Sequence, residues 1–481
     1  MKVLICASEA VPFAKTGGLA DVAGALPKAL AQLGHDVRLA LPYYGQVEAA
    51  GIKATRVGPV RVPIGEATVA GEIFTSDAIP GVTTYLVGNP KYFNRKGLYG
   101  QPDDADRFIF FCRALLEHLT KSDWQPEVIH TNDWQTALIP VYLKSLYRNP
   151  FADVRSVYTI HNLAYQGVFE PASGGRAGLG GDYFTIDTLE FYGNCSFMKG
   201  GIVFADAVST VSPTYSQEIQ TPEFGEKLEG VLAQRKRDLC GILNGIDYDL
   251  WNPATDGLIA KTYEAKSLAD KAANKRALQE QLALPAVEAP VFGLISRFAA
   301  QKGFDLLAEA LPYLLEMQAQ VVVLGVGDAI YHDLLTKLAR QHANQLSVNL
   351  AFDEKLAHRI YAGSDMFLMP SRYEPCGLGQ LISMRYGTVP VVRATGGLAD
   401  TVTNYDPARG EGAGFSFTEY SPVALLGAMA RALLVYKDPK AWAALQRAVM
   451  AQDFSWNASA AQYADLYAKV RRKSRKAPVA G

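Results

Sequence analysis

Two segments combine a basic side chain with glycine, an arrangement that can bind a phosphate or diphosphate. The KTGGL segment at residues 15–19 has paired glycines, which let backbone N–H groups and a helix N-terminus approach an anion, and Lys15 adds a full charge. Arg297 and Lys302 lie five residues apart, just before Gly303. Neither segment matches a Walker A or GxGxxG motif, which disfavours P-loop and dinucleotide sites. A tight turn and solvated surface charge are the plain alternatives.

An acidic residue, Glu374, stands in the glycine-containing segment SRYEPCGLG at residues 371–379. Its carboxylate could hydrogen-bond a sugar hydroxyl or stabilise positive charge that develops at an anomeric carbon. Capping the following helix is the structural alternative. A second TGGL segment, residues 395–398, predicts another set of backbone N–H groups for phosphate or sugar oxygens.

Polar side chains also follow two apolar runs in the first half of the chain. Asp133 lies in HTNDW, residues 130–134, and His161 and Asn162 lie in TIHN, residues 159–162. These side chains could hold sugar hydroxyls, although a histidine at the end of a strand is more often a structural hydrogen-bonding group.

One segment, Asp104-Ala105-Asp106, formally matches the DxD pattern of metal-dependent glycosyltransferases. It directly precedes the helical run RFIFFCRALLEH, so we interpret it as an N-cap with first-turn acids. Lysines, arginines and helix dipoles can neutralise a diphosphate, so we expect no metal.

The elements that position these residues alternate between strands and helices. The chain opens with a strand at residues 2–8, the KTGGL loop and a helix with apolar positions from Leu19 to Leu33, and a strand follows at residues 36–42. Strands at VTTYLVG, EVIHT and RSVYTIH alternate with helices at residues 104–119 and 136–147. This order predicts a parallel sheet covered by helices on both faces.

The same order restarts after residue 243. It consists of a strand VFGLISR ending at Arg297, a helix at 304–317, a strand VVVLGVG, a helix at 331–343, and the strands LSVNLAF, DMFLMPS and TVPVVRA. A polar stretch at residues 247–290, with a helix at 269–282, connects the halves. We therefore predict two Rossmann-like, doubly wound α/β domains, 1–245 and 246–456, with a C-terminal helix at 457–475 that crosses back to the first domain. Ligands of such sheets sit at the carboxyl ends of the strands, so we expect a deep cleft between the domains.

The bulk properties are those of a large folded enzyme. A length of 481 residues exceeds what one core supports, and 49% hydrophobic with 20% charged residues disfavours disorder. The net charge of −1 gives no reason to expect nucleic acid or a membrane as partner. Five scattered cysteines without a CxxC pair read as free thiols, and no signal peptide or membrane span is apparent. We expect a cytoplasmic protein.

Taken together, the motifs resemble those of the glycogen and starch synthase family. KTGGLADVAGALPKAL, HTNDW, IHN, LNGID, SRFAAQKGFDLL, SRYEPCGLGQ and TGGLADTV occur in the family's order and cover essentially the whole chain. Each motif is weak alone, whereas seven in order are highly specific. The resemblance implies the GT-B arrangement, in which the active site lies between two Rossmann-like domains.

Roles for individual residues follow from the resemblance. It implies that Glu374, Arg297, Lys302 and His161 are catalytic, the two cations holding the donor diphosphate. Substrate contacts are implied for Lys15, Gly17, Gly18, Asp21, Asp133, Asn162, Asn244, Phe352, Cys376, Gly377, Leu378, Gly379, Thr395, Gly396 and Gly397. Phe352 would stack on the nucleotide base, and Asn244 would contact the nucleotide side. Relatives commonly carry a hydroxyl or amide side chain where this chain has Gly379, so one donor contact is absent.

The activity that the resemblance implies is retaining glucosyl transfer from ADP-glucose to the non-reducing end of an α-1,4-glucan such as glycogen, without cofactor or metal. Alternatives are a GT-B transferase with another acceptor or a UDP-glucose donor, and a non-catalytic glucan-binding protein, which would be expected to lose its donor-site charges. An NAD-dependent dehydrogenase is disfavoured because GxGxxG and its ribose-binding acid are missing. A homo-oligomer is left open.

Overall fold

The computed structural model describes residues 1–473 and divides them into two compact α/β units. Unit 1 comprises Met1–Gly245 and the segment that begins at Trp456, and unit 2 comprises Ile246–Ser455. Each unit encloses a hydrophobic core of its own. The chain therefore leaves unit 1 after Gly245 and returns to it at Trp456.

Unit 1 is built on a nine-stranded sheet with the order β12-β11-β7-β6-β1-β2-β5-β4-β3. The strands from β12 to β5 are parallel, whereas β4 and β3 extend the sheet as an antiparallel hairpin. The bounds are β1 Lys2–Cys6, β2 Asp36–Pro42, β3 Thr55–Ile64, β4 Ala67–Ile79, β5 Val82–Gly88, β6 Val128–Asn132, β7 Arg155–Ile160, β11 Ala207–Thr210 and β12 Leu239–Gly241. The central residues of the parallel strands β1, β2, β5, β6, β7 and β11 are largely buried and mostly apolar, as expected for strands covered on both faces.

A small antiparallel sheet, β8-β10-β9, and a set of helices complete unit 1. The small strands are β8 Val168–Phe169, β9 Glu190–Phe191 and β10 Asn194–Ser196. The helices are α1 Gly18–Gln32, α2 Gly45–Ala49, α3 Pro90–Phe93, α4 Asp104–Leu119, η1 Trp134–Thr136, α5 Leu138–Lys144, α6 Ala172–Arg176, η2 Gly181–Tyr183, α7 Phe197–Phe204, α8 Pro213–Glu218, α9 Glu229–Gln234 and α18 Trp456–Arg472.

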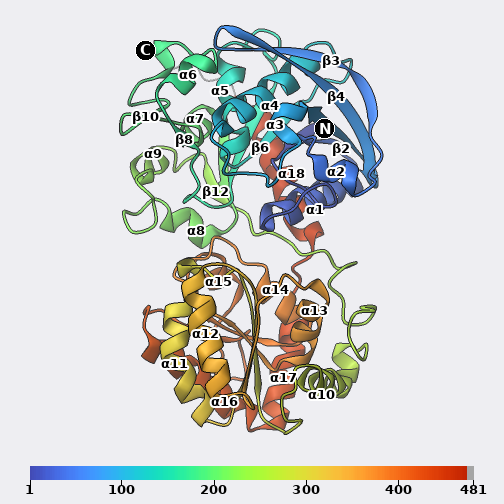
Figure 1. Ribbon diagram of the computed structural model, residues 1–481, viewed down its shortest axis with the longest axis vertical. Helices are drawn as coiled ribbons and strands as arrows, with labels where there is room; N and C mark the ends of the chain where they lie inside the picture. Colours follow the sequence, from blue (N-terminus) through green and yellow to red (C-terminus); the bar gives the residue numbers. More distant parts are fainter. Residues whose placement is uncertain (474–481) are drawn as a thin grey trace. The chain divides into compact units, whose positions relative to one another are not determined.

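Unit 2 contains a parallel six-stranded sheet with the order β15-β14-β13-β16-β17-β18. Numbered within the unit, this is 3-2-1-4-5-6, the Rossmann order. The strands are β13 Val291–Ile295, β14 Gln320–Leu324, β15 Leu346–Asn349, β16 Met366–Met369, β17 Val389–Arg393 and β18 Phe415–Phe417. The helices are η3 Ala265–Asp270, α10 Lys271–Gln281, η4 Ala300–Lys302, α11 Phe304–Glu316, α12 Ala329–Gln341, α13 Glu354–Gly363, α14 Gly379–Arg385, α15 Gly396–Thr401, α16 Pro422–Tyr436 and α17 Pro439–Met450. Helices α11 and α12 cover one face and α13 and α14 the other (Figure 1).

Helix α18 packs in unit 1 although it follows unit 2 in the sequence. It lies along α1, as the red ribbon in Figure 1 shows. The hydroxyl of Tyr467 is 2.7 Å from Nδ1 of the buried His130 on β6, and Ser459 Oγ donates to the Leu243 carbonyl at 2.7 Å. The predicted C-terminal helix thus ends at Arg472, and its last two predicted residues, 474 and 475, lie outside the described residues.

Several sequence-based boundaries need correction. Strand β13 ends at Ile295, so Arg297 lies in the loop after it rather than in the strand. The helix predicted over 136–147 is the shorter pair η1 and α5, which ends at Lys144. No helix within residues 1–473 is long and apolar enough to cross a membrane.

Candidate active site

Most of the predicted site residues lie in loops that follow strands at or next to the points where the strand order of each sheet reverses. In unit 2 this point lies between β13 and β16, and ligands of such sheets generally bind at the carboxyl ends of the strands on either side of it. Arg297 and Lys302 follow β13, Glu374 follows β16, and residues 395–398 follow the next strand, β17. In unit 1 the reversal lies between β1 and β6, after which come the KTGGL loop and Asp133, while His161 follows β7.

Lys302 and Glu374 form an ion pair at the reversal point of unit 2. The Lys302 Nζ lies 2.6 Å from Glu374 Oε2, and Ser371 Oγ donates to the same oxygen at 3.0 Å. The Glu374 side chain is 7% exposed and that of Lys302 22% exposed, so the pair is partly shielded from water. Both contacts engage Oε2, which fixes the direction of the carboxylate. Arg297 is exposed on the loop beside them.

The TGGL segment packs directly on the Glu374 loop. The Gly397 N–H donates to the carbonyls of Glu374 and Pro375, each at 3.1 Å. A Cβ at Gly396 would lie 2.0 Å from the Glu374 carbonyl oxygen, and one at Gly397 2.1 Å from that of Cys376. These glycines thus allow the loop after β17 to pack closely on the loop that carries Glu374. The Gly397 N–H, which was predicted to face phosphate or sugar oxygens, instead donates to carbonyls of that loop. Thr395 is the buried N-cap residue of α15.

The segment from Cys376 to Gly379 leads into α14. Cys376 is buried, Gly377 has a φ of 73° that favours glycine, and Leu378 is the N-cap residue. A Cβ at Gly379 would meet Phe367 Cε1 at 2.9 Å and Met369 Sδ at 3.3 Å. The ring of Phe367 on β16 therefore occupies the space that a side chain at position 379 would need, which gives a packing reason for the glycine.

In unit 1, Asp133 organises the loop that carries His161 and Asn162. Its Oδ1 accepts the His161 N–H at 2.8 Å, and the Asn162 N–H donates to the same carboxyl group. Burial raises the pKa of Asp133 to about 7. Its backbone φ of 54° is uncommon for a non-glycine residue, a strain typical of functional positions.

His161 is a neutral hydrogen-bonding group. Its Nε2 lies 2.8 Å from Asn132 Oδ1, and Asn132 Nδ2 donates to the Cys6 carbonyl at 3.0 Å. This network assigns the proton to Nε2, so Nδ1 is the acceptor nitrogen. Burial lowers the pKa of His161 to about 3. A neutral imidazole of this kind can bind a hydroxyl but carries no charge near pH 7.

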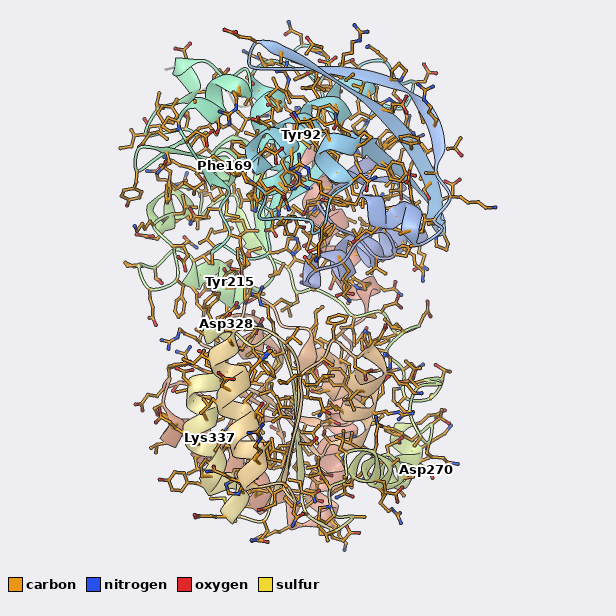
Figure 2. All side chains as sticks on the ribbon, viewed as in Figure 1. Tyr92, Phe169, Tyr215, Asp270, Asp328 and Lys337 are labelled. Carbon is orange, nitrogen blue, oxygen red and sulfur yellow. The ribbon has the colours of Figure 1, made fainter. Side chains whose placement is uncertain are left out.

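A pocket of about 470 Å³ lies within unit 1, and Trp134, the residue after Asp133, forms part of its wall. Its walls are aromatic and polar: Asp104, Trp134, Ala164, Tyr165, Gln166, Gly167, Val168, Phe169, Phe191 and Glu226. Figure 2 marks Phe169, on β8, and Tyr215, on α8, whose hydroxyl accepts the Leu163 N–H at 3.2 Å and so holds the loop after His161. Aromatic walls with a few polar groups suit a sugar.

Lys15 of the KTGGL loop forms an ion pair with a residue of α1. A second carboxylate, that of Glu9, lies below the loop and was not singled out from the sequence. Lys15 Nζ lies 2.7 Å from Asp21 Oδ1, and both side chains are partly exposed, so the pair costs little to open. Below the loop, the buried Glu9 accepts the Thr16 N–H at 2.5 Å and the Thr16 hydroxyl at 2.8 Å. The Gly17 N–H donates to the same carboxyl group. Two N–H groups of this loop, those of Thr16 and Gly17, therefore already donate to Glu9 rather than facing an anion.

Tyr99, which contacts the segment after β1, was also not singled out from the sequence. Its hydroxyl lies 2.7 Å from Ser8 Oγ, directly after β1, and burial raises its pKa. It comes from a glycine-containing loop without regular structure, so no periodic pattern marked it.

Other predicted residues stand alone. Asn244 is buried, and its Oδ1 has no hydrogen-bond partner among the described residues. Phe352 is 87% exposed, in the loop after β15.

The Asp104-Ala105-Asp106 segment has a structural role that differs in detail from the prediction. The N-cap residue of α4 is Asp103, which makes no side-chain cap. Asp104 is buried in an ion pair with Arg107 and accepts the Gly100 N–H at 2.8 Å. Asp106 pairs with Arg176 at 2.7 Å.

We compared the chain with known protein families, curated proteins and solved structures. Residues 2–234 match the family described as starch synthase catalytic domain, and residues 274–448 match glycosyl transferases group 1. The glycogen synthase of Geotalea uraniireducens is 50% identical over 479 residues, which cover 97% of this chain and 98% of that protein. The chain belongs to the glycogen and starch synthase family.

Two further relatives extend the glycogen and starch synthase relation over the full chain. The glycogen synthase of Thermotoga maritima is 49% identical over 98% of this chain and 99% of its own. The catalytic domain of starch synthase IV from Arabidopsis thaliana, solved with ADP and acarbose, is 36% identical with a TM-score of 0.91, covering 98% of this chain and 99% of that one. Sucrose-phosphate synthase from Thermosynechococcus elongatus, 20% identical with a TM-score of 0.60 and 98% coverage of both chains, shares the fold alone. Family membership makes this protein a glycosyltransferase with two Rossmann-like domains.

Proposed function

We propose that the protein is a retaining glucosyltransferase that adds glucose from ADP-glucose to the non-reducing end of an α-1,4-glucan and releases ADP. The observation that carries the proposal is the Lys302–Glu374 pair at the strand-order reversal of unit 2. It joins a cation suited to a departing diphosphate with a carboxylate suited to positive charge at an anomeric carbon.

ADP-glucose is preferred over UDP-glucose as donor for two reasons. The identity with bacterial glycogen synthases extends over nearly the whole chain, and the plant relative was solved with ADP. The diphosphate is common to both donors, so discrimination rests on the base, for which the exposed ring of Phe352 is a stacking surface.

In the proposed reaction, Arg297 and Lys302 hold the diphosphate while the C1–oxygen bond to it breaks. The terminal 4-hydroxyl of the glucan forms the new bond to C1 on the same face, and its proton passes to the leaving phosphate. Glu374 stabilises positive charge at C1, and Lys15 adds charge to the phosphate side. Neutral His161, together with Asp133 and Asn162, binds sugar hydroxyls, and the aromatic pocket beside them accepts a glucan unit.

The proposal includes no metal and no cofactor, because lysine and arginine supply the charge that the diphosphate needs. It also includes a cytoplasmic location, since the five cysteines are free thiols. Cell fractionation tests the location.

The test is transfer of labelled glucose from ADP-glucose and from UDP-glucose to glycogen, with and without EDTA. The proteins are wild type, Glu374→Ala and Glu309→Ala, a control on the exposed surface of α11. We expect ADP-glucose activity that survives EDTA, falls at least 100-fold in Glu374→Ala and is unchanged in Glu309→Ala. Preference for UDP-glucose would overturn the donor, loss with EDTA would overturn metal independence, and incorporation from neither donor would redirect the search to another acceptor.

A further inference from the structure

The KTGGL loop is held from below by one buried carboxylate. Residues 15–18 are exposed on its outer side, so few packing contacts fix them. Glu9, 4% exposed, accepts the Thr16 N–H, the Thr16 hydroxyl and the Gly17 N–H. Further contacts are the Lys15–Asp21 ion pair and the Ala20 N–H, which donates to the Gly17 carbonyl at 3.3 Å, and the Val11 N–H donates to the Ala20 carbonyl at 3.0 Å.

We propose that Glu9 is a positioning residue, which sets the conformation of residues 15–18 and thereby the place of the Lys15 ammonium group. The inference rests on the proposed role of Lys15 at the donor phosphate. A lysine on an exposed loop contributes to a reaction only if its backbone is fixed, because displacement by about 1 Å can cost a factor of about 100 in rate.

The surroundings of Glu9 explain why a carboxylate is needed. Its partners are two N–H groups and a hydroxyl, all of which donate, and an ionised carboxylate is acceptor-only. The Lys15 ammonium pairs with Asp21 rather than with Glu9. Burial and the charge of Asp21 raise the pKa of Glu9, while the three hydrogen bonds act in the opposite direction. The hydrogen-bond donors that stabilise a charged Glu9 carboxylate therefore belong to the loop itself.

The isosteric change Glu9→Gln replaces one of the two acceptor oxygens of Glu9 with a donor group. A glutamine offers one acceptor oxygen and an NH2 group that donates, so at least one loop donor faces another donor. We expect faster amide hydrogen exchange in the peptide that spans residues 14–18. We also expect kcat/KM for ADP-glucose to fall at least 10-fold.

A double-mutant cycle separates positioning from a general loss of structure. The proteins are Glu9→Gln, Lys15→Ala, the double variant and the control Glu72→Gln, which alters an exposed glutamate on β4 that pairs with Arg56 on β3. If Glu9 acts through Lys15, kcat/KM of the double variant equals that of Lys15→Ala within about twofold. Multiplied effects, or unchanged exchange at residues 14–18 in Glu9→Gln, would overturn the proposal.

Two further outcomes keep this proposal distinct from the proposed function. If Lys15→Ala has full activity, the role given to Lys15 at the donor fails, and with it the positioning role of Glu9, while hydrogen exchange still reports whether Glu9 holds the loop. If Glu9→Gln does not fold, Thr16→Val replaces it, since this exposed substitution removes only the hydroxyl donor. Thr16→Val should then lower kcat/KM and speed exchange, Thr16→Ser should restore both, and equal behaviour of the two variants contradicts the proposal.

Discussion

Lys302 and Glu374 are 72 residues apart in the sequence, yet their side chains meet at 2.6 Å because β13 and β16 are neighbours in the sheet. The Rossmann order brings the loop after the first strand against the loop after the fourth. A cation and a carboxylate are therefore brought together by the strand order rather than by a local motif.

This pair should be coupled in stability. Glu374→Gln or Lys302→Met alone leaves one partly buried charge without its partner, and we expect each to cost about 1–3 kcal/mol. The double variant should cost less than the sum, since no charge remains unpaired. Calorimetry of the four proteins, with Glu309→Gln as control, measures the coupling, and additive costs would mean that the two charges act independently.

The raised pKa of Asp133 predicts a pH-dependent stability. Between the usual carboxyl pKa of about 4 and the folded value of about 7, the folded state binds more protons than the unfolded state, so Asp133 lowers stability as pH rises through this window. Asp133→Asn keeps an acceptor oxygen and removes the titration. We expect the variant to gain stability over wild type by about 1–2 kcal/mol between pH 5 and pH 8. Thermal unfolding at both pH values checks this, and a constant difference would contradict it.

Packing at Gly379 predicts a compensating pair. Gly379→Ser places its Cβ against Phe367 and should destabilise unit 2 by about 1–3 kcal/mol. Adding Phe367→Leu makes room, so the double variant should regain part of this loss. Gly427→Ser on α16 is the control, because its Cβ meets nothing closer than 3.9 Å. The measurement is the thermal unfolding midpoint of each variant. A double variant that is less stable than Gly379→Ser would show that the clash with Phe367 is not the cause of the loss.

The contact of α18 with β6 predicts a large effect from one hydroxyl. Tyr467→Phe leaves the buried Nδ1 of His130 without its partner, and we expect a loss of about 1–3 kcal/mol. The matched change Tyr313→Phe, at a 58% exposed tyrosine, should be neutral. Denaturation of both variants provides the measurement, and equal midpoints would show that the hydroxyl contributes nothing.

The positions of the motifs were predictable because apolar strands are easy to recognise and ligands of parallel sheets lie at their carboxyl ends. Lys302, Glu374, Asp133 and His161 all follow strands in the structure, as expected from their sequence context. The hairpin of β3 and β4 was missed. Strand β3 is largely exposed and contains Gly58, Pro59 and Pro63, and β4 is only partly buried, so their apolar signal is weak.

Contacts between loops were beyond sequence reasoning. Glu9 has no motif of its own, and only the turn back of the chain brings it under Thr16 and Gly17. For the same reason the Gly397 N–H could be predicted to lie after a strand, whereas its acceptor, the carbonyl of Glu374, could not. Spacing predicts which edge of a sheet a residue occupies, and tertiary packing decides what it touches.

The return of α18 to unit 1 sets an order for folding during synthesis. The ribosome releases residues 1–245 first, but the face that receives Tyr463 and Tyr467 stays uncovered until the whole of unit 2 has been made. Unit 2 is continuous in sequence, so it can complete its core before unit 1 does. Helix α18, which is made after unit 2, therefore closes the first domain to begin folding.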